Sequence, residues 1–172
     1  MDVDGSNNVY ISGVATTSSV SRDFLTIKYT SGGTQSWASL YDHQGYVDMA
    51  VKVRVSGSQI ISTGAVQVNS TTWAIGMLSY NISTGTQNSL TATILSSNIV
   101  FNEINGFTTD ASDNTYIVGA KDNGANGYDY LTIKVDASLS VVWSATWNGS
   151  GGKDVAKAVA VDGSGRRASG SQ

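Results

Sequence analysis

The chain has 172 residues, of which none is cysteine and only 13% are charged. Without cysteine it can form neither a disulfide bond nor a thiolate metal site. The formal net charge is −3, and the only pair of adjacent basic residues is Arg166-Arg167. Nucleic acid and anionic membranes attract basic surfaces, so we expect neither as a partner.

Long apolar runs are missing as well. No stretch reaches the ~18 consecutive apolar residues that a membrane-spanning helix needs, so we expect no membrane insertion. Met1 is followed by Asp2, Val3 and Asp4 rather than by a basic and then an apolar run, which is unlike a signal peptide. We therefore expect either an intracellular protein or an internal or processed piece of a longer chain.

Histidine is nearly absent, since His43 is the only one. It lies in the segment YDHQGY, which we predict to be a loop, and there a histidine is more often an ordinary surface residue than a general base. The sequence has no metal-ligand spacing, no phosphate-binding loop and no GxGxxG motif. We expect no catalytic residues, no metal and no cofactor.

The sequence does contain an internal repeat. DFLTIKYT at 23–30 returns as DYLTIKVD at 129–136, 106 residues later. A degraded copy lies between them, where IGMLSYN at 75–81 matches 24–30 at an offset of 51. Such periodicity is typical of repeat architectures. The units span about 4–55, 56–109 and 110–161, and residues 162–172 form the degenerate head of a fourth unit.

Each unit is predicted to hold four strands. In the first unit these are 9–13, 24–29, 35–41 and 49–55, in which apolar and polar residues alternate and β-branched and aromatic side chains are frequent. Gly, Asn, Asp and Ser separate the runs, as turns require. No run keeps a period of 3.6, so we expect an all-β protein without substantial helix.

Four strands in a unit of about 40–50 residues are typical of a β-propeller blade. A β-helix would need shorter coils, and a sandwich would not repeat in this way. We therefore predict a single β-propeller domain over 1–172, with three four-stranded antiparallel blades. Closed propellers typically have 4–8 blades, so we expect either a homo-oligomer, in which two chains form a six-bladed ring, or a part of a larger propeller.

The repeat resembles the SBBP-type β-propeller repeats of bacteria. The resemblance covers nearly the whole chain and is weaker in the second unit, where Asn88 stands in the place of Trp37. The residues that carry it are Val3–Ser6, Asn8–Tyr10, Gly13, Asp23–Tyr29, Trp37, Tyr41 and Asp154–Gly163. It implies a propeller, often secreted or on the cell surface, and no particular activity.

The resemblance also implies a strand order, in which the inner strand of each blade comes first in the sequence. In that order the chain begins at the second strand of a blade and ends after a first strand, 155–161. We expect no strand after it, because Arg166-Arg167 replaces the Val-Tyr pair of the other units. The strand 155–161 could instead close against the first strand of the chain.

Oxygen-bearing side chains gather in the first turn, at Asp2, Asp4, Ser6 and Asn7. They invite a calcium interpretation. No acidic residue closes the loop, however, and the copies at 56 and 162 lose most of the donors. We prefer a tight hairpin turn, in which Gly and Asn take positive φ.

Three polar residues, Asp48, Asn102 and Asp154, open the predicted inner strands and would form a polar ring at the central channel. The ring could hold a cation or a polar ligand, but we prefer the interpretation that each residue caps a loop. A propeller glycoside hydrolase would need two carboxylates ~5–9.5 Å apart, for which Asp48 and Asp154 are the candidates.

The remaining candidates are aromatic residues and loop residues that differ between repeats. Trp37 and Trp143 occupy equivalent positions, for which we predict packing between neighbouring blades rather than stacking on sugars. Loops that vary on a rigid scaffold are where binding residues concentrate. The candidate binding residues are Tyr41, Asp42, His43, Tyr46, Asp122, Asn123, Asn126, Tyr128, Trp147 and Asn148.

The leading functional hypothesis is a non-catalytic binding or scaffold module. It would contact a protein or a glycan in a secreted or cell-surface bacterial assembly, a location that comes from the resemblance. One alternative is a propeller enzyme, a lyase or glycoside hydrolase with its site in the channel. Another is a purely structural set of blades within a larger protein.

Overall fold

A computed structural model describes residues 1–17, 22–88, 93–124, 127–162 and 167–170. The regular structure in these ranges is strand, without an α-helix, so the predicted all-β class is confirmed. In the described ranges no helix is long and apolar enough to cross a membrane. The chain forms two compact units, Met1–Ile94 and Leu95–Gln172.

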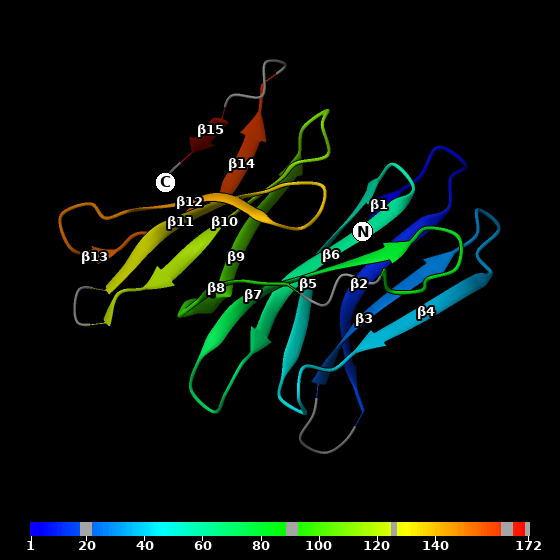
Figure 1. Ribbon diagram of the computed structural model, residues 1–172, viewed down its shortest axis with the longest axis horizontal. Helices are drawn as coiled ribbons and strands as arrows, with labels where there is room; N and C mark the ends of the chain where they lie inside the picture. Colours follow the sequence, from blue (N-terminus) through cyan, green and yellow to red (C-terminus); the bar gives the residue numbers. More distant parts are fainter. Residues whose placement is uncertain (18–21, 89–92, 125–126, 163–166, 171–172) are drawn as a thin grey trace. The chain divides into compact units, whose positions relative to one another are not determined.

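The first unit holds two antiparallel sheets, drawn in blue to green in Figure 1. Sheet A has the order β1 (Asp2–Val3), β2 (Val9–Thr16), β3 (Arg22–Tyr29) and β4 (Gln35–Tyr41). Sheet B has the order β5 (Asp48–Ser56), β6 (Gln59–Gln67), β7 (Trp73–Asn81) and β8 (Thr93–Ser97), and β8 runs across the boundary of the two units. Consecutive strands are neighbours in both sheets, because short turns favour antiparallel pairing.

The second unit repeats this arrangement. Sheet C has the order β9 (Ile99–Thr109), β10 (Thr115–Asp122), β11 (Gly127–Val135) and β12 (Val141–Trp147). The short strand β13 (Gly152–Lys153) pairs with β11 in parallel, an addition that the sequence did not predict. Sheet D consists of β14 (Ala158–Val161) and β15 (Arg167–Gly170).

The end of the chain differs from the expectation. β15 forms where no strand was expected, and it pairs with β14 from Ala158↔Gly170 to Val161↔Arg167. Backbone pairing of this kind does not require the Val-Tyr pair that Arg166-Arg167 replaces. The edge of β2 is paired by β1, through Asp2↔Tyr10 and Val3↔Val9.

The sequence repeat is also a structural repeat, down to its irregularities. Lys28 pairs with Trp37, and Lys134 pairs with Trp143, 106 residues further on. In both sheets the register shifts directly after that lysine. The bulge lies at the same position of β3 and of β11. The repeat itself therefore specifies the turn that follows each of these two strands.

The pleat gives each sheet two faces with different residues. We call the aromatic face of sheet A the one that carries Tyr10, Ser12, Phe24, Thr26, Lys28, Trp37 and Tyr41, which lie opposite one another in the strand register. The aliphatic face carries Val3, Val9, Ile11, Leu25, Ile27, Tyr29 and Leu40. The same alternation gives sheet C an aromatic face with Tyr116, Lys134 and Trp143 and an aliphatic face with Ile117 and Ile133. On sheet B we call the face with Ile60, Leu78 and Tyr80 the aliphatic face.

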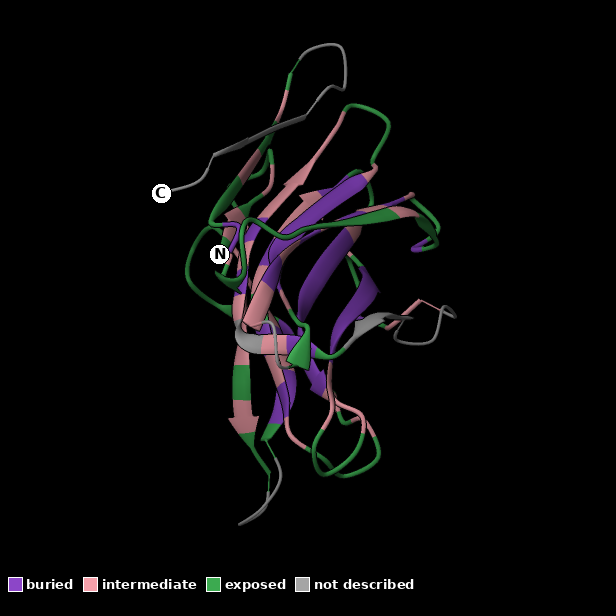
Figure 2. Ribbon diagram, turned by 90° about the vertical axis from the view of Figure 1, so that its left-hand side faces the viewer, coloured by how far each residue is buried: buried purple, intermediate pink, exposed green. Residues whose placement is uncertain are grey.

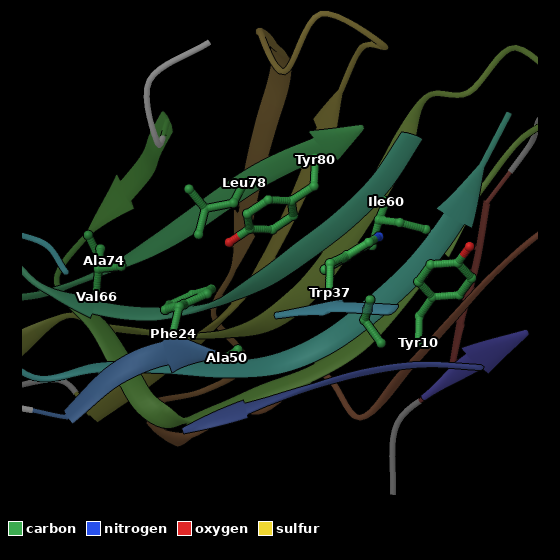
Figure 3. Packing of buried hydrophobic residues seen from close by; sticks show 10 residues of the cluster. Tyr10, Phe24, Trp37, Ala50, Ile60, Val66, Ala74, Leu78 and Tyr80 are labelled. Atoms are coloured by element: carbon green, nitrogen blue, oxygen red, sulfur yellow. The ribbon is translucent and has the colours of Figure 1, made fainter. Parts of the chain in front are cut away.

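In the first unit the aromatic face of sheet A packs on the aliphatic face of sheet B. Tyr10, Phe24 and Trp37 form one cluster with Ile60 and Tyr80 of sheet B, as Figure 3 shows. The Trp37 ring lies 6.1 Å from that of Tyr10 and 6.3 Å from that of Tyr80. The predicted packing role of Trp37 between neighbouring sheets is confirmed, since its side chain is only 8% exposed.

Sheet B is buried on both faces in its two middle strands. Seven consecutive residues are buried in β6, and seven in β7. Buried residues are purple in Figure 2. In a strand whose two faces are both buried, apolar residues are favoured on either face, so alternation of polar and apolar residues is not needed. This explains why the second repeat lost the polar–apolar pattern of the other two.

Candidate functional site

The carboxylate of Asp4 closes the turn between β1 and β2. Its Oδ1 accepts hydrogen bonds from the backbone N–H groups of Ser6 and Asn8, both at 2.9 Å. Its Oδ2 accepts from Asn8 Nδ2 (2.8 Å) and from the Tyr10 hydroxyl (2.9 Å). These bonds, chiefly that from the Asn8 side chain, lower the pKa of Asp4 to about 2.

Asp110 makes the same turn in the third repeat. Its carboxylate accepts from the backbone N–H groups of Ser112 (2.9 Å) and Asn114 (3.0 Å) and from the Tyr116 hydroxyl (3.0 Å). In both copies the two carboxylate oxygens are therefore engaged within the turn. This supports the hairpin interpretation over calcium binding, and within the described ranges no group of three or more His, Asp or Glu is arranged to hold a metal.

Asp48 and Asp154 each cap the loop that precedes them. Asp48 Oδ2 accepts from the backbone N–H of His43, and Asp154 Oδ2 accepts from that of Gly149 at 2.9 Å. Both donors lie five residues before the carboxylate, so the bond is a property of the repeat. The capping role that we preferred for these residues is what the structure shows.

Of the three polar residues predicted to open inner strands, only Asp48 does so. Asp48 opens β5, but Asn102 is the fourth residue of β9, and its side chain lies outside the described residues. Asp154 follows β13 and precedes β14. Asp48 and Asp154 belong to different compact units, and they remain a predicted pair only.

Asp48 has the most perturbed acidity of the described carboxylates. Its side chain is fully buried, and its Oδ1 has no hydrogen-bond partner. Burial raises the pKa of Asp48 to about 7, and the nearby carboxylates of Asp42 and Asp23 add to the rise. The hydrogen bond from the backbone N–H of His43 acts in the opposite direction and lowers the pKa. A full charge is therefore unfavourable here near neutral pH.

The binding residues predicted in the first unit gather around the loop between β4 and β5. The Tyr41 hydroxyl lies 3.1 Å from His43 Nδ1, and Asp42 Oδ1 accepts from the backbone N–H of Gly45 at 2.7 Å. Tyr46, at 36% exposure, lies at the surface of this loop. The backbone N–H of Gln67 donates to Val47 O at 3.0 Å, so the loop after β6 lies beside the loop before β5.

The second unit brings together the corresponding loops. The backbone N–H of Asp154 donates to Tyr128 O at 2.7 Å, which joins the loop before β14 to the start of β11. The ammonium of Lys153 lies 5.3 Å from the centre of the Tyr128 ring. Asp122 donates its backbone N–H to Asn98 O at 2.7 Å, which adds the loop before β9.

Polar side chains of these loops are held by short local bonds. Asn123 Nδ2 donates to Asp129 Oδ2 at 2.9 Å, and Asn148 Oδ1 accepts from the backbone N–H of Gly151 at 3.3 Å. Asn126 lies outside the described residues. Within each unit the variable loops thus meet at one end of the sheets, whereas the two groups of loops belong to different units.

Trp147 lies on a sheet face rather than in a loop. It is the last residue of β12, it pairs with Tyr130, and the two rings lie 5.5 Å apart. Its side chain is 58% exposed. Its equivalent in the first repeat is Tyr41, on the aromatic face of sheet A.

Sequence reasoning overlooked two buried acids and an ionic cluster. Asp23 and Asp129 are equivalent residues of the repeat, at 3% and 8% exposure. Glu103 accepts from Lys153 (3.0 Å) and Lys157 (2.7 Å), and these contacts, chiefly with Lys157, lower its pKa to about 2. The recurrence of Asp23 as Asp129 was the one sequence signal that could have indicated the two buried acids. The Glu103 cluster had no local signal, because it joins residues 50 or more positions apart.

Comparison with known proteins adds no family to these observations. No protein-family model matches the chain, and no curated protein matches it.

Proposed function

We propose that the chain supplies blades of a β-propeller that serves as a non-catalytic binding or scaffold module. The repeated four-stranded antiparallel sheets support the architecture, as does the packing of an aromatic face on the aliphatic face of the next sheet in the first unit. We also propose a secreted or cell-surface location, for which the resemblance to SBBP-type repeats is the only support.

One observation carries the binding role. In each unit one backbone hydrogen bond joins the segment before an inner strand to the end of a neighbouring strand, from Gln67 at the end of β6 to Val47 in the first unit and from Asp154 to Tyr128 at the start of β11 in the second. Variable loops held together on a rigid sheet are the usual place for a binding surface. Tyrosines such as Tyr46 and Tyr128 add large contact area at low entropic cost, which suits contact with a protein or a glycan.

The carboxylates argue against the enzyme alternative. One carboxylate oxygen of each of Asp4, Asp110 and Asp154 accepts from a backbone N–H group of its own turn or loop. Asp48 has the raised pKa of a general acid, but its side chain is fully buried and cannot reach a substrate. If no ligand binds, the purely structural alternative, a set of blades within a larger protein, is favoured.

Binding to a glycan array and to an array of extracellular protein domains tests the proposal. We expect specific binding that Tyr46→Ala or Tyr128→Ala lowers at least tenfold. Ser31→Ala is the matched control, because Ser31 is exposed in the turn at the other end of sheet A. Binding that survives both loop substitutions would place the ligand elsewhere, and hydrolysis of a chromogenic glycoside that Asp154→Asn abolishes would favour the enzyme.

A further inference from the structure

Strand β2 is paired over its full length on one edge only. On that edge it pairs with β3 along all eight of its residues. On the other edge β1 pairs with Val9 and Tyr10 alone. Among the described strands none pairs with β2 beyond Tyr10 on this side, so residues 11–16 form an open strand edge.

The equivalent strands of sheets B and C, β6 and β10, are paired on both edges. On the corresponding edge β6 pairs with β5 at residues 59–66, and β10 pairs with β9 from Thr115 to Lys121. Seven consecutive residues of β6 and the first six of β10 are buried, whereas in β2 only Tyr10 is buried and Val14 is 42% exposed. β2 therefore has the place of a middle strand without the full inner strand that covers its equivalents.

A glycine that recurs in the middle of these strands marks where the inner strand comes close. The three copies are Gly13, Gly64 and Gly119. A Cβ atom on Gly64 would overlap the backbone carbonyl oxygen of Met49, and one on Gly119 would overlap that of Glu103. In both sheets the register of the inner strand shifts beside this glycine, so the glycine makes room for a bulge.

Gly13 has no such neighbour. Nothing lies within 4 Å of a Cβ atom placed on it, and it does not have the positive φ for which glycine is otherwise needed. The close approach for which β6 and β10 use this glycine is therefore not made in sheet A. The open edge also carries no charged residue that would oppose pairing with another strand, since β2 reads VYISGVAT.

We propose that the open edge of β2 binds an extended peptide segment in antiparallel pairing, as an added strand of sheet A. The backbone groups along such an edge supply the hydrogen bonds of strand addition. The segment has the chemistry of the inner strands that β6 and β10 receive, with an apolar residue opposite Gly13. Ala50 takes that place opposite Gly64, Ile104 takes it opposite Gly119, and both are buried.

This inference goes beyond the proposed binding role of the loops. Strand addition uses the backbone of β2, whereas the proposed loop surface uses side chains such as those of Tyr46 and Tyr128. The Tyr46→Ala chain should therefore bind an added strand as the wild type does. Failure of the strand test would leave the loop-binding proposal to its own test, and the reverse holds as well.

The probe is a peptide with the sequence of residues 48–53, DMAVKV, acetylated and amidated so that its ends carry no charge. By the repeat it pairs with residues 11–15 and stops where β1 begins. The peptide is added to the isotope-labelled full chain, and the backbone amide signals are followed by NMR. We expect saturable shifts and slower hydrogen exchange at residues 11–16. The same peptide with proline at its third and fourth positions lacks two N–H groups and should not bind.

Gly13→Ala tests the place of the added strand. The new Cβ atom has space in the chain alone but would overlap the added strand, as a Cβ atom on Gly64 would overlap Met49 O. We expect unchanged thermal unfolding and a dissociation constant for the peptide that is at least tenfold higher. Gly32→Ala is the matched control, because its Cβ atom meets only Thr30 Oγ1, at 3.8 Å, in the turn after β3.

Binding that Gly13→Ala weakens and Gly32→Ala leaves intact supports the inference. The absence of saturable binding at millimolar peptide would overturn it. Equal binding by the wild-type and Gly13→Ala chains, or shifts confined to another strand, would overturn it as well.

Discussion

Trp37 donates its indole N–H to the backbone carbonyl oxygen of Ile82, 45 residues away, at 3.3 Å. The bond joins sheets A and B within the first unit, and Lys28 donates to the same oxygen at 3.0 Å. A half-buried carbonyl oxygen gains from a hydrogen-bond partner, so these two side chains of another sheet stabilise the turn after β7. The tryptophan and lysine that mark the repeat therefore act in packing one repeat on the next.

Replacement of Trp37 should be among the most damaging changes in the first unit. Trp37→Ala removes a side chain that is 8% exposed together with its hydrogen bond, and we expect a loss of about 3–5 kcal/mol in the free energy of unfolding. Urea denaturation followed by circular dichroism measures the loss. Trp147→Ala, at a 58% exposed tryptophan of the other unit, is the control and should cost less than ~1 kcal/mol in the monomeric chain. Equal losses would mean that Trp37 is not the packing residue that we describe.

Gly85 tests how closely the turn approaches the indole ring. Gly85 has a φ of 69°, and its Cβ position lies 2.4 Å from the Trp37 ring. Gly45 has a φ of 77° with nothing within 4 Å of its Cβ position. Both Gly→Ala variants share the strain of positive φ, about 1 kcal/mol, and Gly85→Ala should cost ~1–3 kcal/mol more because of the clash. Thermal unfolding of the two variants gives the difference, and similar midpoints would contradict the close approach.

Asp48 predicts a pH dependence of stability. Its pKa is raised to about 7 in the folded chain, so the folded state favours the protonated form. This contribution is fully present below the unfolded pKa of 3.8 and is lost as the pH rises through about 7.

Asp48→Asn keeps an oxygen acceptor for the His43 N–H and removes the ionisation. We expect the variant to be more stable than the wild type at pH 8, by on the order of 1–3 kcal/mol, and similar to it below pH 4. Urea unfolding at pH 4, 6 and 8 measures this. Asp48→Ala removes the cap as well and should be destabilised at every pH, and parallel profiles for wild type and Asp48→Asn would refute the prediction.

Asp4 predicts the opposite dependence at acid pH. Its pKa is lowered to about 2, so its contribution is present above 3.8 and is lost as the pH falls through about 2. Asp4→Ala should remove this acid-sensitive part and lower the stability at pH 7 by about 1–2 kcal/mol, because the N–H groups of Ser6 and Asn8 lose their acceptor. Ser6→Ala is the control, since only its backbone is seen to bond to Asp4. Acid titration of the three chains by circular dichroism distinguishes them.

The strands were predictable because their signals are local. Alternation and turn residues place 9–13, 24–29, 35–41 and 49–55 within β2 to β5. The turn role of Asp4 and the capping role of Asp48 followed from their recurrence in a unit that needs closed loops. The strand β15 was missed because pairing with β14 uses the backbone and does not require the side chains of the other repeats.

Other features depended on contacts between residues distant in the sequence. Nothing local to Asp48 shows that its side chain is fully buried with an unpartnered oxygen. Trp147 was grouped with the loop residues because it is equivalent to Tyr41 and lies near a strand end, and the strand register places it opposite Tyr130 on a sheet face.

The sequence by itself determined the all-β class, the repeat and the turns, because period-two alternation and turn chemistry act over a few residues. The tertiary structure decided which face of each sheet is covered. Equivalent residues differ in this respect, as Ile27 is half-buried and Ile133 fully buried, although both occupy the same place in the same repeated motif. The reason is that burial depends on the neighbouring sheet, and the sequence of one repeat carries no record of that neighbour.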